Sequence, residues 1–487
     1  MIEGMKTIHS RDHQTTFATL TSLTLVSTLA ALLLARAPTQ ACGSYYGDLD
    51  LQNLAELAVS ENSAAASRAI TALRAKGDAG LAAFLVVHSE EIQRQAATVP
   101  IFSLAQTNKP IDARWARLSK ALDTIGGQRD CAASRLYWHT DLEKAKAAAA
   151  ASGKPILSLR LLGRLDEELS CANSRFFRTA LYANAEVSLL LRDHFVLHWQ
   201  SVRPVPKITI DFGDGRKLER TITGNSIHYV LDADGRPIDA LPGLYGPKAF
   251  LRGLMRAQAA AKKLAGLPTE ERDDFLRAYH QERLAAIKAD WTSDLVKVGS
   301  SSATTSSLTS ATLSANNPPA AQAAAQVTRG KRQVELPVLD ALGIAKPGEL
   351  EAKMDDATWA KLATLHSEDA RLDQGSRMLM AKKNPDAFAA GKRARSKMIV
   401  EDPLVRAARQ FERSMAEDTV RNEYLFHTKI HEWFAQALPG TQDVAVLNEK
   451  VYAELFLTPS SDPWLGLKPN DAYSALEHDG VVTAAKH

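Results

Sequence analysis

Residues 134–262 alternate between helical and extended sequence patterns, and this alternation constrains the fold more than any other feature of the chain. A helix is expected where Asp141 begins an alanine-rich stretch, because alanine favours helix and Gly153 stops it. Apolar runs of strand length and a further helical pattern follow. The predicted order is helix, strand, helix and strand, at residues 141–152, 156–162, 173–192 and 195–199.

Two β-hairpins are predicted next, each with a glycine-containing turn between two extended runs. The first joins residues 208–212 to 218–222, and the second joins 227–231 to 237–241. A helix from about residue 247 to 261 completes the region. A chain with this order of elements is expected to form an α/β sandwich with a mixed sheet.

The same residues resemble the thioredoxin-like family, in particular its exported members. The motifs that carry the resemblance are Trp138-x-x-Asp-Leu before Gly153-Lys-Pro, Cys171-Ala-Asn-Ser174 after the first strand, and Val230-Leu-Asp with Gly235 and Pro242-Gly243 in the last hairpin. The family places a Cys-x-x-Cys motif at the start of the helix after its central strand. The resemblance therefore implies a site at Cys171 and Ser174, and a thioredoxin-like α/β domain flanked by mostly α-helical N- and C-terminal regions.

Two functional positions depart from the family pattern. Ser174 replaces the second cysteine of the motif, and Ser226 stands near the position of the family's cis-proline. Without a resolving thiol, the motif cannot complete an ordinary dithiol cycle, in which a second thiolate attacks the mixed disulfide.

Three roles for Cys171 remain open. At a helix N-terminus the thiolate is favoured, so Cys171 could exchange disulfides as a single thiol, with Ser174 as hydrogen-bond donor, although acidic residues at 166–168 oppose this. Alternatively, Cys171 forms a structural disulfide with Cys131 in an oxidising compartment. In the third reading, the domain binds partners without redox chemistry.

The N-terminus has the pattern of a secretory signal peptide. The uncharged apolar stretch 17–35 follows Lys6 and Arg11, and small residues precede Cys42. This predicts a signal peptide over residues 1–41 and a protein of the periplasm or cell envelope. Two alternatives are an uncleaved membrane anchor and a lipoprotein acylated at Cys42, and these are the only expected sources of membrane association.

The remaining segments read mainly as helical. Residues 69–84 resemble one unit of a HEAT-type repeat, although no second copy is evident and a small helical cap on the next domain is the simpler interpretation. Residues 299–327 carry no charge and are rich in Ser, Thr and Ala, which predicts a flexible tether. The expected divisions are a helical segment at 42–130, the thioredoxin-like domain at 131–262, a helical extension at 263–298, a linker at 299–330 and a separate helical C-terminal module at 331–487.

His427 and His431 are a candidate metal-ligand pair, because histidines four residues apart share one helical face. The metalloprotease motif His-Glu-x-x-His is incomplete here, since no histidine follows His431-Glu at the required spacing. Tyr424 and Phe434 accompany the pair, so a partly buried helix face is the simpler interpretation. His198 and His228 lie in apolar strands and are expected to be packed.

The charge balance excludes a dedicated nucleic-acid binder, because 59 basic against 56 acidic side chains give a net charge of only +3. No phosphate-binding glycine loop or nucleophile elbow is present in the sequence, and no cofactor is expected. Protein partners are expected.

The leading hypothesis is an exported thioredoxin-like protein that acts on or binds partner thiols through Cys171. The alternative is a non-enzymatic envelope scaffold, and a third hypothesis is a metal-dependent hydrolase centred on His427 and His431.

Overall fold

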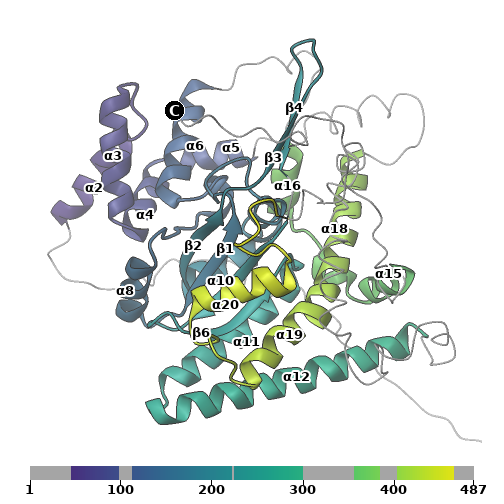
Figure 1. Ribbon diagram of the computed structural model, residues 1–487. Helices are drawn as coiled ribbons and strands as arrows, with labels where there is room; N and C mark the ends of the chain where they lie inside the picture. The colour runs from purple at the N-terminus through teal and green to yellow at the C-terminus, as the bar shows by residue number, and fades with distance from the viewer. Residues whose placement is uncertain (1–44, 98–111, 222–223, 300–355, 384–402, 466–487) are drawn as a thin grey trace, which may run out of the picture. The chain divides into compact units, whose positions relative to one another are not determined.

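The structure is a computed structural model that describes residues 45–97, 112–221, 224–299, 356–383 and 403–465 (Figure 1). The expected signal peptide, Cys42 and the predicted linker after Gly299 lie outside the described residues. Two compact units are distinguished, Met1–Asp50 and Leu51–His487. All elements treated below belong to the second unit, except the first residues of helix α2 (Tyr45–Leu57).

A four-stranded mixed sheet lies at the centre of the second unit, as the alternating pattern predicts. Its strands are β1 (Ile156–Leu162), β2 (Val196–Arg203), β5 (Ser226–Leu231) and β6 (Pro237–Pro242). In the order β2-β1-β5-β6, β2 is parallel to β1, whereas β5 and β6 are each antiparallel to their neighbour. Strands β1, β5 and β6 are buried along their whole length, so the sheet is covered on both faces.

The helices of this region begin and end where their capping residues stand. The Asp141 carboxylate accepts hydrogen bonds from two backbone N–H groups at the start of α8 (Leu142–Ser152), and Gly153 ends that helix in the left-handed conformation at φ 68°. The helix predicted at 173–192 is instead divided, because a π-helical turn interrupts it and Asn184 caps a new helix. Its parts are α9 (Ala172–Phe176), η1 (Phe177–Leu181) and α10 (Ala185–His194), and α11 (Pro247–Ala265) follows the sheet.

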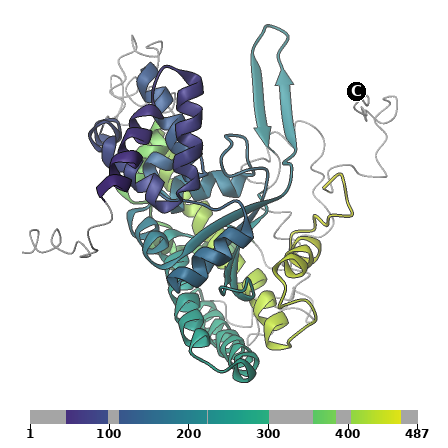
Figure 2. The ribbon, with the colours of Figure 1, turned by 90° about the vertical axis from the view of Figure 1, so that its left-hand side faces the viewer.

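The first predicted hairpin forms, but it does not join the central sheet. Strands β3 (Lys207–Asp211) and β4 (Lys217–Thr221) pair only with each other within the described residues. Figures 1 and 2 show this hairpin projecting from the central sheet. Its residues are mostly exposed, which agrees with its charged and polar composition.

The helices before the sheet have a hydrophobic core of their own. They are α2, α3 (Ser63–Ala75), α4 (Asp78–Val87), α5 (Ser89–Ala97), α6 (Ala113–Gly126) and α7 (Cys131–Ser134). Arg74 connects this core to the chain that enters the sheet, because its guanidinium donates to the carbonyl oxygens of Ile125 at 2.7 Å and Trp138 at 2.6 Å.

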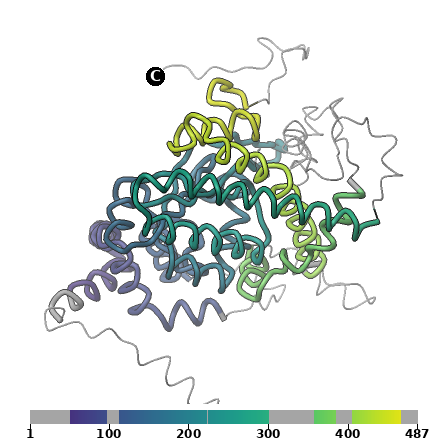
Figure 3. Tube along the Cα trace, turned by 90° about the horizontal axis from the view of Figure 1, so that it is seen from below, coloured from purple at the N-terminus to yellow at the C-terminus, as the bar shows by residue number. Residues whose placement is uncertain are grey.

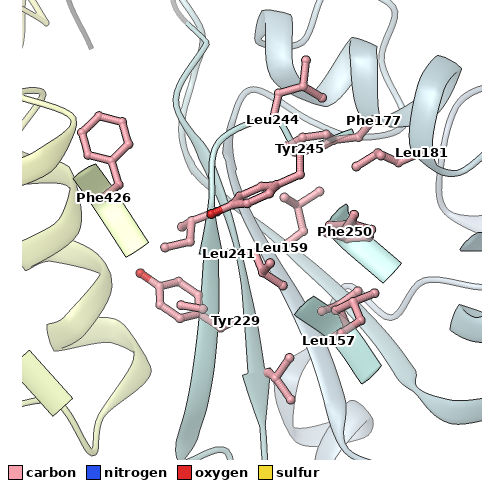
Figure 4. Close-up of a cluster of buried hydrophobic side chains, with 14 of the residues drawn as sticks. Leu157, Leu159, Phe177, Leu181, Tyr229, Leu241, Leu244, Tyr245, Phe250 and Phe426 are labelled. Carbon is pink, nitrogen blue, oxygen red and sulfur yellow. The ribbon is translucent and has the colours of Figure 1, made fainter. Parts of the chain in front are cut away.

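The helices after the sheet are not a separate module, contrary to the sequence-based expectation. They are η2 (Thr269–Glu271), α12 (Arg272–Lys297), α15 (Asp356–Leu365), η5 (Ser367–Ala370), α16 (Gln374–Lys383), α18 (Pro403–Arg421), η6 (Asn422–His427), α19 (Thr428–Ala435), α20 (Val444–Lys450) and η7 (Val451–Leu455). Their apolar residues share one core with the sheet. In Figure 4, Tyr229 and Phe426 lie on the side of the C-terminal helices, and Phe177, Leu181 and Phe250 lie on the other.

Two contacts of these helices position the sites described below. Figures 1 and 3 show α12 as a long helix that runs beside α11, and α19 packs against it. The π-helical turn η6 lies against β6, which is an edge strand of the sheet. Among the described residues, none of the helices combines the length and apolarity needed to cross a membrane.

Candidate functional site

Cys171 stands at the N-terminus of α9, directly after the loop that follows β1, and its side chain is fully buried. The Sγ atom lies 3.3 Å from Ser174 Oγ and 3.0 Å from Ser226 Oγ. Ser174 Oγ lies 2.7 Å from Ser170 Oγ. The fold therefore brings together the two motif residues and the residue that the resemblance aligns with the family's proline. Together they form a buried group of hydroxyls around one thiol.

The acidic residues before Cys171 are engaged in ion pairs and not directed at its sulfur. Arg164 lies 2.7 Å from Asp166 and 3.5 Å from Glu167, while Glu168 pairs with Arg129 at 2.9 Å and with Lys383 at 3.2 Å. Their negative charge is thus compensated by neighbouring cations.

A disulfide between Cys131 and Cys171, one of the three roles considered for Cys171, is not formed in the structure, in which both are free thiols. Cys131 belongs to the core of the N-terminal helices, whereas Cys171 belongs to the core around the sheet. The Cys131 thiol donates to the carbonyl oxygen of Leu136 at 3.6 Å. Burial, with a smaller contribution from Asp123, raises the pKa of the Cys131 thiol far above its usual range, so this thiol is inert.

The chain's own C-terminal segment, residues 444–465, is bound to the loop before β5. Asn225 in that loop donates from Nδ2 to Thr458 Oγ1 at 3.1 Å, and its carbonyl oxygen accepts from the Tyr452 hydroxyl at 3.1 Å. The Arg203 guanidinium, at the end of β2, donates to the carbonyl oxygens of Thr458 and Asp462 at 3.0 and 2.8 Å. This segment therefore covers the sheet end at which Ser226 approaches Cys171.

A second polar site lies at the edge strand β6, and we call its residues Asp239, His280, Glu423, His427 and His431 the histidine cluster. The two histidines predicted from the sequence are both buried, on η6 and α19. Ligand atoms of Asp239, His427 and His431 all lie within 4.8 Å of one another. The His427 ring is held between two carboxylates, with Nε2 3.2 Å from Asp239 Oδ1 and Nδ1 2.8 Å from Glu423 Oε2.

Helix α12 contributes His280 to the histidine cluster, and its Tyr279 and Arg283 contact the two carboxylates of the cluster. The Nδ1 atoms of His280 and His431 are 2.8 Å apart, so one of these rings donates to the other. Tyr279 donates to Asp239 Oδ2 at 2.5 Å. Arg283 approaches Glu423 Oε1 at 3.5 Å, on the far side of Glu423 from the imidazole that it holds.

Opposing effects of burial and charge set the ionisation of the histidine cluster. Burial lowers the pKa of His427, but the charges of Glu423 and Asp239 outweigh it and raise the pKa to about 9. Burial raises the pKa of Asp239, but the imidazoles of His431 and His427 outweigh it and hold that pKa well below its usual range. Burial lowers the pKa of His280 to about 4, and burial and His427 lower that of His431. Among the three imidazoles of the cluster, His427 therefore holds a proton most strongly, because it lies between two carboxylates.

The sequence indicated only part of this cluster. Glu423 is four residues before His427, so helical spacing could have predicted it as a neighbour of that histidine. Asp239 is a charged residue inside an apolar strand, which is a sign of a buried polar contact. His280 gives no local signal, because only the packing of α12 against α19 brings it near. The prediction that His198 and His228 are packed is confirmed, since both are buried and bond to Ser158 Oγ at 2.8 Å and Tyr182 Oη at 2.7 Å.

Comparison with known proteins adds no further constraint. No family model matches the chain, and neither a curated protein nor a solved structure matches it significantly.

Proposed function

We propose that this chain is an exported, non-enzymatic binding or scaffold protein built around a thioredoxin-like domain whose thiol is closed off. Several observations support a thioredoxin-like arrangement. Strand order β2-β1-β5-β6 carries one parallel and two antiparallel pairings, a helix with Cys171 at its N-terminus follows β1, and Ser226 at the start of β5 approaches the sulfur. The motif Cys171-x-x-Ser174 lacks the second thiol of a dithiol cycle.

The burial of Cys171 is the single observation that carries this proposal. Thiol exchange requires a sulfur of the partner to approach the attacking thiolate, so a fully buried thiol cannot react without a local opening. The C-terminal segment is bound over the same end of the sheet through Asn225 and Arg203. The surface through which a redox partner would dock is therefore used by the chain itself.

A monothiol exchange activity is the second candidate function, and the hydroxyls around the sulfur favour it. Ser174 and Ser226 lie 3.3 and 3.0 Å from Sγ, where a hydroxyl can stabilise a thiolate by hydrogen bonding. In this case the C-terminal segment has to detach before a partner can bind. The two candidates differ in whether Cys171 is accessible in the native protein.

Maleimide labelling of the full chain distinguishes the two candidates. In a variant with Cys42→Ala and Cys131→Ala, Cys171 is the single remaining thiol. We expect native labelling on the order of 100-fold slower than in denaturant, equivalent to an opening free energy of about 2.7 kcal/mol. Circular dichroism of the variant verifies that it is folded. Native labelling as fast as denatured labelling, together with mixed-disulfide trapping that Cys171→Ser abolishes, would overturn the proposal in favour of thiol exchange.

Export rests on the N-terminal sequence and needs its own measurement. The intact mass of protein recovered from the periplasm is expected to correspond to a chain that begins at Cys42. An added acyl mass would identify a lipoprotein, and retention of residues 1–41 in the membrane fraction would identify an uncleaved anchor.

A further inference from the structure

We propose that Asp239, His427 and His431 bind one zinc-type divalent ion that joins the C-terminal helices to edge strand β6. The inference is independent of Cys171 and of the proposed function. Two imidazoles and one carboxylate are a donor set that Zn²⁺ accepts, with a fourth position left for water or another side chain. The three residues come from β6, η6 and α19, which are separated in sequence and meet only in the folded chain.

The spacing of the donor atoms suits such an ion. Zinc binds nitrogen and oxygen ligands at about 2.0–2.2 Å, so two ligand atoms on a tetrahedral ion lie roughly 3.3 Å apart. Asp239 Oδ1 and His427 Nε2 are 3.2 Å apart, and a donor atom of His431 lies within 4.8 Å of both. Binding requires the His431 donor atom to come within about 3.3 Å of the other two donor atoms.

The groups behind the donors hold them in the orientation that metal binding needs. Glu423 Oε2 lies 2.8 Å from His427 Nδ1 and directs Nε2 of the same ring toward Asp239. Tyr279 donates to Asp239 Oδ2, while Oδ1 accepts from the Ala240 backbone N–H at 2.8 Å and lies 3.2 Å from His427 Nε2. Partners of this kind fix the ring tautomer and increase the basicity of the ligand, and they accompany most protein metal sites.

His431 supplies an independent sign of unused binding capacity. Its side chain is fully buried, and its Nδ1 contacts His280 Nδ1 at 2.8 Å. The His431 Nε2 atom is buried without a hydrogen-bond partner among the described residues. If His431 donates from Nδ1, its Nε2 carries a lone pair that can bind a cation, and His280 then acts as the orienting partner.

The histidine cluster is open to the surface on the side of His280. Because metal ligands must be deprotonated, binding of the ion competes with protons for the two imidazoles. A pocket beside the cluster reaches His280 from the surface, between α12 and the end of α19. The pocket is lined by Arg236, Asp273, Leu276, His280, Phe434 and Thr441, among others.

Metal titration of the full chain tests the proposal. Purified protein is stripped with a chelator and titrated with Co²⁺ and Zn²⁺, with bound metal measured by mass spectrometry and Co²⁺ coordination by its visible absorption. We expect one ion per chain, an absorption spectrum typical of tetrahedral nitrogen and oxygen ligands, and a higher Tm with Zn²⁺.

Variants separate a ligand role from a structural one. Asp239→Asn and His431→Gln should each weaken Zn²⁺ binding at least ~100-fold, and Glu423→Gln, which keeps all three ligands, should weaken it roughly 10- to 100-fold. His88→Gln is the matched control, since His88 is a buried histidine among the N-terminal helices, and it should bind as wild type does. A wild-type chain that binds neither ion stoichiometrically overturns the proposal, whatever the variants do. Unchanged affinity in folded Asp239→Asn and His431→Gln would overturn it as well.

Discussion

The Cys171 site and the histidine cluster both lie where C-terminal residues pack on the sheet, yet they satisfy their polar groups by different means. Around Cys171 the partners are neutral hydroxyls of Ser174 and Ser226, which can either donate or accept. The histidine cluster contains carboxylates and imidazoles whose charges compensate one another. Replacing one neutral group costs little, whereas a buried charge that loses its partner is expensive. Removal of one charged member of the histidine cluster should therefore cost more than removal of one hydroxyl near Cys171.

Removal of the Asp239 carboxylate should have the largest effect. Asp239→Ala leaves the Tyr279 hydroxyl and one nitrogen of the His427 imidazolium buried without their partner, so we expect a loss of about 3–5 kcal/mol in the free energy of unfolding. Urea denaturation in the presence of a chelator measures this loss without any contribution from metal. The matched control is Asp273→Ala, because Asp273 pairs with Arg236 at a largely exposed position and should contribute under ~1 kcal/mol. Equal effects of the two substitutions would contradict the comparison.

The free energy of unfolding should depend on pH through His366, whose imidazole contacts the carboxylates of Asp294 and Asp369. Hydrogen bonds to Asp294 and Asp369 raise the pKa of His366 to about 9. A raised pKa in the folded state means that the contribution is complete below about pH 6.5, the ordinary pKa of histidine, and is lost as the pH rises through 9.

His366→Gln should therefore cost about 1–2 kcal/mol at pH 6 after allowance for solvent screening, and much less above pH 9. Denaturation midpoints of both proteins between pH 6 and pH 10 measure the difference. A cost that stays constant over this range would show that His366 contributes by packing and not by charge.

Contacts of the C-terminal segment should control the accessibility of Cys171 with only a moderate effect on stability. Asn225→Ala removes the hydrogen bond to Thr458 and one to the carbonyl oxygen of Phe456, which together should cost about 1–1.5 kcal/mol. If that cost falls on the local opening, native maleimide labelling of Cys171 accelerates by roughly 10-fold. Val446→Ala, at an exposed position of the same segment, is the control and should leave the rate unchanged. An unchanged rate in Asn225→Ala would mean that other residues close the site.

The sequence predicted the local elements far better than their long-range contacts. Strand-length apolar runs, the Asp141 cap and the two glycine turns lie within short windows, and all of them form as expected. The division of the helix after Cys171 was missed, because the apolar pattern continues through the π-helical turn and Asn184 alone marks the new start.

The candidate sites show the same limit. Cys171 and Ser174 are neighbours in sequence, so their contact was predictable, and the pair His427 and His431 follows from helical spacing. Asp239 and His280 join the cluster only because the C-terminal helices share one core with the sheet. The Ser/Thr/Ala-rich segment at 299–327 predicted a separate module, so this contact was not expected from the sequence. The attachment of residues 444–465 to the loop before β5 is a long-range contact of the same kind.

The smallest effect is expected at Cys171 itself. Cys171→Ser places a hydroxyl among the hydroxyls of Ser174 and Ser226, where it can donate and accept, so the unfolding free energy should change by less than ~1 kcal/mol. Cys131→Ser is the matched comparison, because that thiol lies in the core of the N-terminal helices and its contact with the Leu136 carbonyl oxygen is long at 3.6 Å. A hydroxyl in its place should cost about 1–3 kcal/mol. Urea denaturation of both variants under reducing conditions measures the two costs. If Cys171→Ser is the more destabilising of the two, the surroundings of Cys171 are specific for sulfur and the hydroxyls do not suffice to satisfy a substitute.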